Sequence, residues 1–368
     1  MGRIDTGRWV VAAGLACVAM AAQAQSGVSR GDFTDGLVAL TSNTSAPSNW
    51  RVTSGMNFNG VSFDGVARLA FDSDGSLNNG FNVCSGTLLS GGQYVLTAAH
   101  CADNFNVMQV DFGVYGGASS LTRGVSAAYV NPNWVNSGVS LANGSDMAIL
   151  KLDAPVTTIQ GFNISTTNDT GSSMLVMGYG TTGTGGSGLA TNWDDWGWAH
   201  WGRNEADVGL QTFDQALWPG AYTYHGDEYI FDFDNGNSAN NTLDILAGLY
   251  GNQWTSSNGL GTEEALTAGG DSGGGDFVWT GTEWRVSGVH SWGAEICGGP
   301  GASYNLGCDV APGVLSSYGD LSGSSAVFTH AAWINSVTGV PEPETYAMMI
   351  MGLGVLGVLR RRQQRRSR

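Results

Sequence analysis

The stretch "LTAGGDSGGGDF" (residues 266–277) decides how this chain is interpreted. A serine set between an aspartate and glycines is typical of a nucleophile loop, where residues without a Cβ let backbone amides approach a reacting oxygen. The chain contains 57 glycines in 368 residues, so a glycine-rich run alone carries little weight. Ser272 therefore needs a histidine base and an orienting carboxylate elsewhere in the chain.

Both groups are present, each beside a predicted strand. His100 follows "QYVLTA", which has the residue types of a strand, and Asp146 precedes the apolar run "MAILKL". An aspartate directly before an apolar strand is poorly solvated and needs a strong partner, and a histidine Nδ1–H is such a partner. Each residue alone would be interpreted as structural, but the three together indicate a Ser-His-Asp triad.

The order of the three residues and their flanking segments resemble the chymotrypsin/trypsin family of serine proteases. The matching segments are "LTAAHC", "DMAILKL", "GDSGG", "VMGYGTT" (176–182), "VSGVHSWG" (286–293) and "VFTHAAWI". The resemblance covers about residues 61–339 and implies an all-β fold of two antiparallel six-stranded β-barrels with a short C-terminal helix. The first barrel would span about residues 61–165 and the second about 170–339.

The resemblance also implies a role for each site residue. Ser272 is the expected nucleophile, His100 the general base and Asp146 the group that orients His100. The amides of Gly270 and Ser272 would form the oxyanion hole. Asp271 would turn inward as a structural residue, and the backbone of Ser291 and Gly293 would pair with the substrate strand. The remaining histidines (His200, His225, His290 and His330) have no such context and are interpreted as structural.

The specificity pocket is expected to be apolar. Counting back from Ser272, the family pattern places Leu266 at the pocket base, with Gly293 and Ala326 as walls, which predicts cleavage after apolar, small-to-medium residues. Ala268 stands where the family usually has a cysteine that closes the pocket. A register shift of two residues would place Glu264 at the base and favour basic residues, so both registers stay open.

Four cysteines remain after the N-terminal segment is removed, and an exported chain favours disulfides. Four cysteines allow three pairings, and proximity favours Cys84–Cys101 and Cys297–Cys308. Zinc is the competing use of four cysteines, but no C-x-x-C spacing occurs.

The N-terminal residues 1–24 have the pattern of a secretory signal peptide, with two arginines, an apolar run and the cleavage sequence Ala22-Gln23-Ala24. Residues 25–60 form an N-terminal segment that could act as a propeptide. In the family, a new N-terminus folds in and pairs with the aspartate before the nucleophile. Cleavage after Arg51 would expose Val52 for this purpose, and the alternative is that Asp271 finds another partner.

The C-terminal segment 340–368 contains Val340-Pro341-Glu342-Pro343, an apolar run over 346–359 and an arginine-rich tail. It resembles the PEP-CTERM sorting signal of Gram-negative bacteria, which implies processing by an exosortase near Pro-Glu-Pro. As a helix, the apolar run would be about 21 Å long, short of a hydrocarbon core of about 30 Å. It could still insert as a transmembrane helix with local thinning of the bilayer, which predicts a protein at the cell surface or outside the cell.

The formal net charge is −16, and most of the basic residues lie at the two ends. An acidic body of this kind excludes nucleic acid as a main partner and leaves membrane contact to the C-terminal helix. We expect a monomer whose partners are polypeptide substrates and a processing exosortase. No cofactor is expected.

An insertion of about residues 183–262 lengthens the second barrel. It contains Trp193, Trp196, Trp198 and Trp201, which could stack on sugars but are better explained by packing against the barrel. Asp232 and Asp234 leave bound calcium as the alternative to a protein without a cofactor. A hairpin turn at Asn235-Gly236 explains this segment better than an EF-hand loop, whose glycine stands one position later.

The sequence therefore predicts a secreted serine endopeptidase. The alternative is a surface or matrix binding protein on a protease scaffold, with binding by the tryptophan-rich insertion and little catalysis.

Overall fold

The computed structural model describes residues 41–42, 47–78, 81–135, 141–189, 197–217, 219–220, 223–297 and 306–339. The predicted signal peptide (1–24), most of the segment 25–60 and the sorting segment (340–368) lie outside these residues. No helix within the described ranges is long and apolar enough to cross a membrane.

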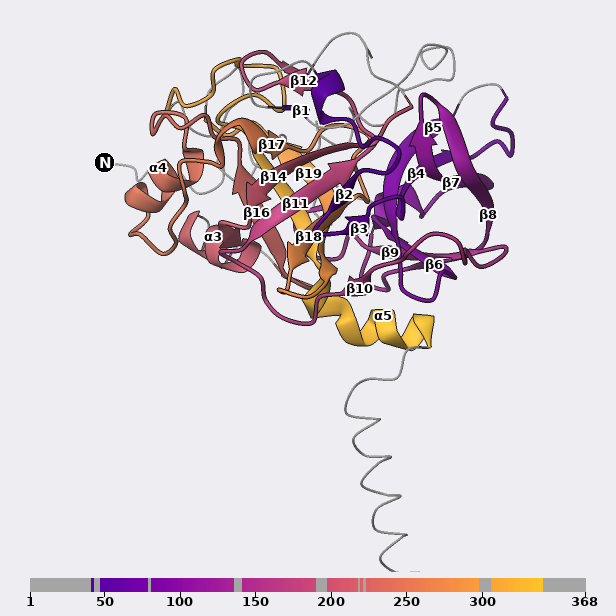
Figure 1. Cartoon of the computed structure of the whole chain (residues 1–368). Helices are drawn as coiled ribbons and strands as arrows, with labels where there is room; N and C mark the ends of the chain where they lie inside the picture. The colour runs from indigo at the N-terminus through magenta and orange to yellow at the C-terminus, as the bar shows by residue number, and fades with distance from the viewer. Residues whose placement is uncertain are drawn as a thin grey trace, which may run out of the picture. The chain divides into compact units, whose positions relative to one another are not determined.

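The first half of the chain forms the closed barrel that the sequence predicts, drawn in indigo and violet (Figure 1). Its strands follow each other around the barrel in the order β4 (Val66–Asp72), β5 (Asn82–Leu88), β6 (Tyr94–Thr97), β9 (Ala148–Leu152), β8 (Ala118–Val130) and β7 (Val107–Tyr115). Apolar residues fill the interior, and Leu69, Leu96, Val110 and Ile149 are fully buried. All six pairings are antiparallel.

The second half departs from the predicted closed barrel. It is an eight-stranded sheet in the order β14 (His200–Glu205), β11 (Ser173–Gly178), β18 (Gly275–Trp279), β19 (Trp284–Ala294), β20 (Leu321–Ala326), β16 (Glu228–Asp232) and β15 (Val208–Gly209), with β10 (Asn163–Ile164) paired to β19. Within the described ranges, β14 and β15 end the sheet without pairing to each other. β15 is two residues long and runs directly into helix α3 (Leu210–Leu217).

The pairings also include parallel ones. β10 runs parallel to β19, and β1 (Thr41–Ser42) runs parallel to β12 (Gly183–Thr184) in a small sheet completed by β13 (Gly188–Leu189) and β17 (Ala265–Leu266). A two-stranded pair is formed by β2 (Asn57–Phe58) and β3 (Val61–Ser62). The remaining short elements are the 3₁₀ turns η2 (Pro47–Trp50), η3 (Ala99–Cys101), η4 (Gly261–Glu263) and η5 (Val327–His330) and the helix α5 (Ala331–Thr338).

The range predicted as an insertion, 183–262, supplies β14, β15 and β16 to the second sheet. The predicted hairpin at Asn235-Gly236 is wrong. After β16 ends at Asp232, the chain turns and enters helix α4 (Thr242–Leu249), and the Asn241 side chain caps this helix by accepting the Asp244 N–H at 2.7 Å. A side chain that satisfies a free amide of the first turn favours a helix start over a returning strand.

The described tryptophans of this range pack against the body, as the sequence interpretation favoured. Trp201 makes edge-on ring contacts with Trp50 and Phe58, both at 5.0 Å between centroids. Trp198 lies beside Tyr115, and the Arg51 guanidinium lies over its ring. Trp193 and Trp196 lie outside the described residues.

Candidate active site

The pairing of β6 with β9 brings His100 and Asp146 together. These strands are antiparallel, with Thr97 opposite Ala148, so the end of β6 lies beside the start of β9. His100 follows β6 on the turn η3, and Asp146 precedes β9. The His100 Nδ1 lies 2.7 Å from Asp146 Oδ2, and the His100 backbone N–H donates to Asp146 Oδ1 at 3.0 Å. The two residues therefore form the pair that the sequence predicts.

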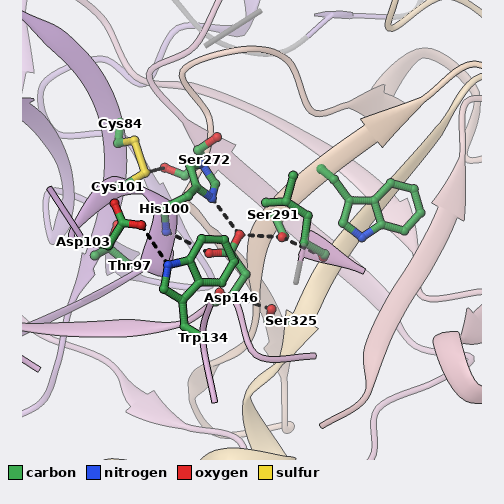
Figure 2. Close-up of polar contacts among 12 residues, drawn as sticks. Cys84, Thr97, His100, Cys101, Asp103, Trp134, Asp146, Ser272, Ser291 and Ser325 are labelled. Carbon is green, nitrogen blue, oxygen red and sulfur yellow. Dashed lines mark hydrogen bonds and ion pairs between the residues drawn. A yellow bond between two sulfur atoms is a disulfide. The ribbon is translucent and has the colours of Figure 1, made fainter. Parts of the chain in front are cut away.

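Asp146 is fully buried, and a third donor completes its surroundings. Ser291 Oγ donates to Asp146 Oδ2 at 2.6 Å, so the carboxylate lies between His100 and Ser291 (Figure 2). Ser325 Oγ donates to the Asp146 carbonyl at 3.2 Å. The sequence interpretation used only the backbone of Ser291. Its side chain is a contribution that no local pattern indicates, because 145 positions separate it from Asp146.

The charge of Asp146 changes the proton affinity of His100. Burial by itself lowers the pKa of His100, but the charge and hydrogen bond of Asp146, with a smaller effect of Asp103, raise it above its ordinary value. Asp103 also accepts the indole N–H of Trp134 at 2.8 Å, and this ring lies 6.4 Å from the imidazole between centroids. The Nε2 of His100 is buried and has no hydrogen-bond partner among the described residues.

The nucleophile loop is anchored on the first barrel. The Ser272 carbonyl accepts the Ser85 N–H at 2.8 Å, and Cys101 Sγ lies 3.6 Å from the same oxygen. Gly273 adopts φ +81°, and a Cβ there would lie 2.1 Å from Thr97 Oγ1 and 2.4 Å from the Ser85 carbonyl. A residue without a Cβ is therefore required directly after Ser272.

Two predicted features of the loop have a physical basis in the structure. Gly270 adopts φ +99°, and a Cβ there would lie 2.8 Å from the Cα of Gly180. Asp271 is fully buried and turned inward, where its carboxylate accepts the backbone N–H groups of Gly180 and Ala268, both at 2.9 Å.

Val52, which cleavage after Arg51 would turn into a new N-terminus, is packed into the fold of the uncleaved chain. Val52 is buried, and its N–H donates to the Ala199 carbonyl at 2.7 Å. Cleavage after Arg51 stays a prediction. The alternative is that Asp271 pairs with a group other than a new N-terminus, and the backbone amides of Gly180 and Ala268 are such partners.

A second buried histidine–aspartate pair supports the same loop. His290 Nε2 lies 2.8 Å from Asp276 Oδ1, and His290 Nδ1 lies 3.2 Å from the Asp271 carbonyl. Both neighbours are acceptors, so both ring nitrogens carry a proton when both bonds are made. Burial lowers the pKa of His290, but Asp276 and then Asp271 raise it above its ordinary value. The sequence interpretation took His290 as structural without identifying these partners.

The predicted specificity residues lie in different surroundings. Leu266 and Ala326 belong to one buried apolar cluster, and Gly293 lies in β19 opposite Ser322. Glu264 is buried, and its carboxylate accepts the Leu260 N–H.

The only group of three His, Cys or acidic side chains at metal-ligand spacing among the described residues is Cys84, His100 and Cys101. Its two cysteines form a disulfide, so their sulfurs are not available as thiolate ligands.

The disulfides pair as the sequence predicts, Cys84 with Cys101 and Cys297 with Cys308. The first joins β5 to η3 and so constrains the backbone on which His100 lies (Figure 2).

Two parts of the chain are similar to known protein families. Residues 55–193, which include His100 and Asp146, match the family described as Trypsin, and residues 339–366 match the PEP-CTERM protein-sorting motif. A solved structure of HL collagenase is similar at 18% sequence identity, with 79% of this chain and 100% of that chain covered and a TM-score of 0.48. The chain is therefore similar to a trypsin domain over residues 55–193 and carries a PEP-CTERM sorting motif over residues 339–366.

Proposed function

We propose that this protein is an exported serine endopeptidase that hydrolyses peptide bonds through an acyl-enzyme. The observation that carries the proposal is the 2.7 Å contact between His100 Nδ1 and the buried Asp146 carboxylate, beside the anchored Ser272 loop. An imidazole whose Nδ1–H is held by a carboxylate presents Nε2 as the proton acceptor. The hydrogen bond from Ser272 to Nε2 would form when substrate is bound, since such bonds are often long in ligand-free enzymes.

In the proposed reaction, Ser272 Oγ attacks the scissile carbonyl carbon while His100 Nε2 takes the hydroxyl proton. Asp146 stabilises the resulting imidazolium, which passes the proton to the leaving amine as the C–N bond breaks. Water then attacks the ester by the same route and releases the carboxylic acid and Ser272. The amides of Gly270 and Ser272 would stabilise the oxyanion, and loss of one such donor costs about 2.7–4 kcal/mol of barrier.

We propose that the enzyme cleaves after apolar, small-to-medium residues. The burial of Leu266 and Ala326 in one apolar cluster supports this register. The position of the Glu264 carboxylate, at the Leu260 amide, also supports it. Cleavage of a peptide library by the purified protein separates the two registers. A strong preference for cleavage after Arg or Lys would favour Glu264 at the base of the pocket.

Labelling with a fluorophosphonate tests the activity most directly. The exported wild-type chain should be labelled covalently, Ser272→Ala should not, and Ser90→Ala, which changes an exposed serine, should be labelled like the wild type. Absence of labelling in correctly folded, processed wild-type protein would contradict the enzyme and favour a binding protein on a protease scaffold.

The PEP-CTERM motif points to export. We propose that an exosortase processes the chain near Pro341-Glu342-Pro343 and that the mature protein acts at the cell surface or outside the cell.

A further inference from the structure

Four carboxylates outside the catalytic pair are buried where β14, β15, β16 and β17 come together. The exposed fractions are 6% for Asp207, 1% for Asp232, and 2% for both Asp234 and Glu264. They come from three segments of the chain, since Asp207 precedes β15, Asp232 and Asp234 lie at the end of β16 and just after it, and Glu264 precedes β17. We call these four residues the acidic cluster.

Backbone and side-chain contacts hold these segments together. The Asp207 N–H donates to the Ile230 carbonyl of β16 at 3.1 Å. Asn204 Nδ2 donates to the carbonyls of both Asp232, at 2.8 Å, and Ala265, at 3.0 Å. The end of β16 and the start of β17 are therefore joined through one amide.

The other two members meet at a glycine. A Cβ on Gly259 would lie 2.6 Å from Asp234 Cβ and 3.2 Å from Glu264 Oε2. Asp234 and Glu264 therefore flank Gly259, which adopts φ +92°. The loop that carries Gly259 thus packs against the acidic cluster.

The Asp207 carboxylate has an oxygen with no protein partner. Its Oδ1 is buried and has no hydrogen-bond partner among the residues that the structure describes. Ser256 Oγ donates to Asp232 Oδ1 at 3.4 Å, and the charge of Asp232 raises the pKa of Asp207, so the two carboxyls are neighbours. Buried polar oxygens normally have a hydrogen-bond partner, so the unpaired Oδ1 of Asp207 calls for a ligand.

Burial of like charges together is costly without a counter-charge. Burial, and then the charge of Asp232 together with those of Glu205 and Glu264, raises the pKa of Asp207. Burial also raises the pKa of Glu264 to about 8, although the Leu260 N–H opposes this change. The neighbouring charges that act on these two residues are acidic, so a bound cation would relieve the repulsion.

We propose that the acidic cluster binds one Ca²⁺ ion. Ca²⁺ takes six to eight oxygen ligands and accepts several carboxylates, whereas Mg²⁺ usually keeps its waters and binds one or two. Within the described residues, no three of these carboxylates bring one oxygen each within 4.8 Å of one another. The ion would therefore draw the side chains inward. The inference does not depend on the proposed peptidase activity.

The place of the site in the fold gives the ion a structural role. Glu264 is followed by β17 and then by the segment that leads to Gly270 and Ser272. A cation that joins Glu264 to Asp207 and Asp232 would brace this segment against β15 and β16. We therefore expect calcium to stabilise the fold.

The test is a calcium titration of the purified chain after treatment with EDTA, followed by calorimetry and thermal unfolding. We expect one Ca²⁺ per chain. At a calcium concentration 100-fold above Kd, the Tm should rise by about 5–10 °C, and Mg²⁺ at the same concentration should raise it less. The variants Glu264→Gln and Asp207→Asn should lose the calcium-induced shift. In EDTA they should unfold at or above the wild-type temperature, because one buried charge has been removed.

Glu263→Gln is the matched control. Glu263 is the adjacent residue in the chain, but its side chain is 46% exposed and pairs with Arg203 at 2.8 Å, so this variant should respond to calcium like the wild type. A wild-type chain that binds no calcium overturns the proposal without any variant. Undiminished binding by Asp207→Asn also overturns it, as does an equal loss in the Glu263 and Glu264 variants.

Discussion

The buried carboxylate of Asp146 accepts three hydrogen bonds, from the backbone and ring of His100 and from the Ser291 hydroxyl. These donors hold the buried carboxylate in one orientation, and the carboxylate in turn orients the imidazole. Each donor limits the rotation of the carboxylate. The orientation of His100, the proposed base, therefore depends on Ser291, which lies in the second half of the chain, as well as on the first barrel.

The pH dependence of activity follows from the raised pKa of His100. The base works only when its ring is neutral, so kcat/KM for a peptide substrate should fall as pH decreases through this pKa, with a midpoint above 6.5. Asp146→Asn should lower the midpoint and reduce kcat by about 10⁴-fold. Asp153→Asn, at an exposed position, should leave the profile unchanged. A wild-type midpoint below 6.5 would contradict the role given to Asp146.

Gly273 is predicted to be irreplaceable for steric reasons. Gly273→Ala would drive a Cβ into Thr97 and the Ser85 carbonyl, which should displace Ser272 and reduce activity by at least about 100-fold. Gly281 has a similar φ of +95° and no atom within 4 Å of an added Cβ, so Gly281→Ala should cost only about 1 kcal/mol. Thermal unfolding and steady-state kinetics of both variants separate the clash from the conformational strain.

At the scale of elements, the site is a product of strand pairing and of one disulfide. The antiparallel register of β6 and β9 brings His100 to Asp146, and the Cys84–Cys101 bond ties η3 back to β5. The loop that carries Ser272 packs against β5 through the contacts of Ser85 with Ser272 and Gly270. The element that carries the nucleophile therefore depends on the first barrel for its position.

Removal of the first disulfide should affect both stability and catalysis. The double variant Cys84→Ala/Cys101→Ala opens a loop of 17 residues, and the unfolding free energy should fall by about 3 kcal/mol on the chain-entropy account. Because His100 lies on η3, kcat should fall as well. Cys297→Ala/Cys308→Ala should lower stability with a smaller change in kcat. Equal kinetic effects of the two double variants, measured below their unfolding temperatures, would argue against the positioning role.

At the scale of the whole molecule, the two main features are the net charge and the sorting motif at the C-terminal end. The chain has a formal net charge of −16, although its C-terminal end is rich in arginine. A net charge far from zero favours solubility. The PEP-CTERM match covers residues 339–366, directly after the described helix α5. The sorting segment is therefore separate in sequence from the residues proposed to carry catalysis.

Processing should depend on the Pro-Glu-Pro sequence. A variant with Pro341, Glu342 and Pro343 all changed to alanine should remain uncleaved in its host, and Glu344→Ala should be processed normally. The intact mass of the protein recovered from membrane and medium measures the outcome. Normal cleavage of the triple variant would show that the exosortase does not recognise this motif here.

The amino-acid sequence by itself determined the local features of this protein. The strands around His100 and Asp146, the nucleophile loop and the two short-range disulfides are encoded in short stretches, where apolar patterns, turn residues and spacing are sufficient. The first barrel followed for the same reason, because consecutive strands pair in the way that its patterns predict.

Only the tertiary structure decided the contacts between distant segments. The second half is a sheet whose end strands, β14 and β15, do not pair with each other within the described ranges. Ser291, in the second sheet, reaches Asp146, beside the first barrel, because elements far apart in the chain pack against each other. For the same reason Glu264, which precedes β17 of the small sheet, lies close enough to Asp207 for its charge to act there. A local pattern reports which face of a strand is apolar. Which acids share a buried space depends on topology, so the acidic cluster emerges only once the sheet is assembled.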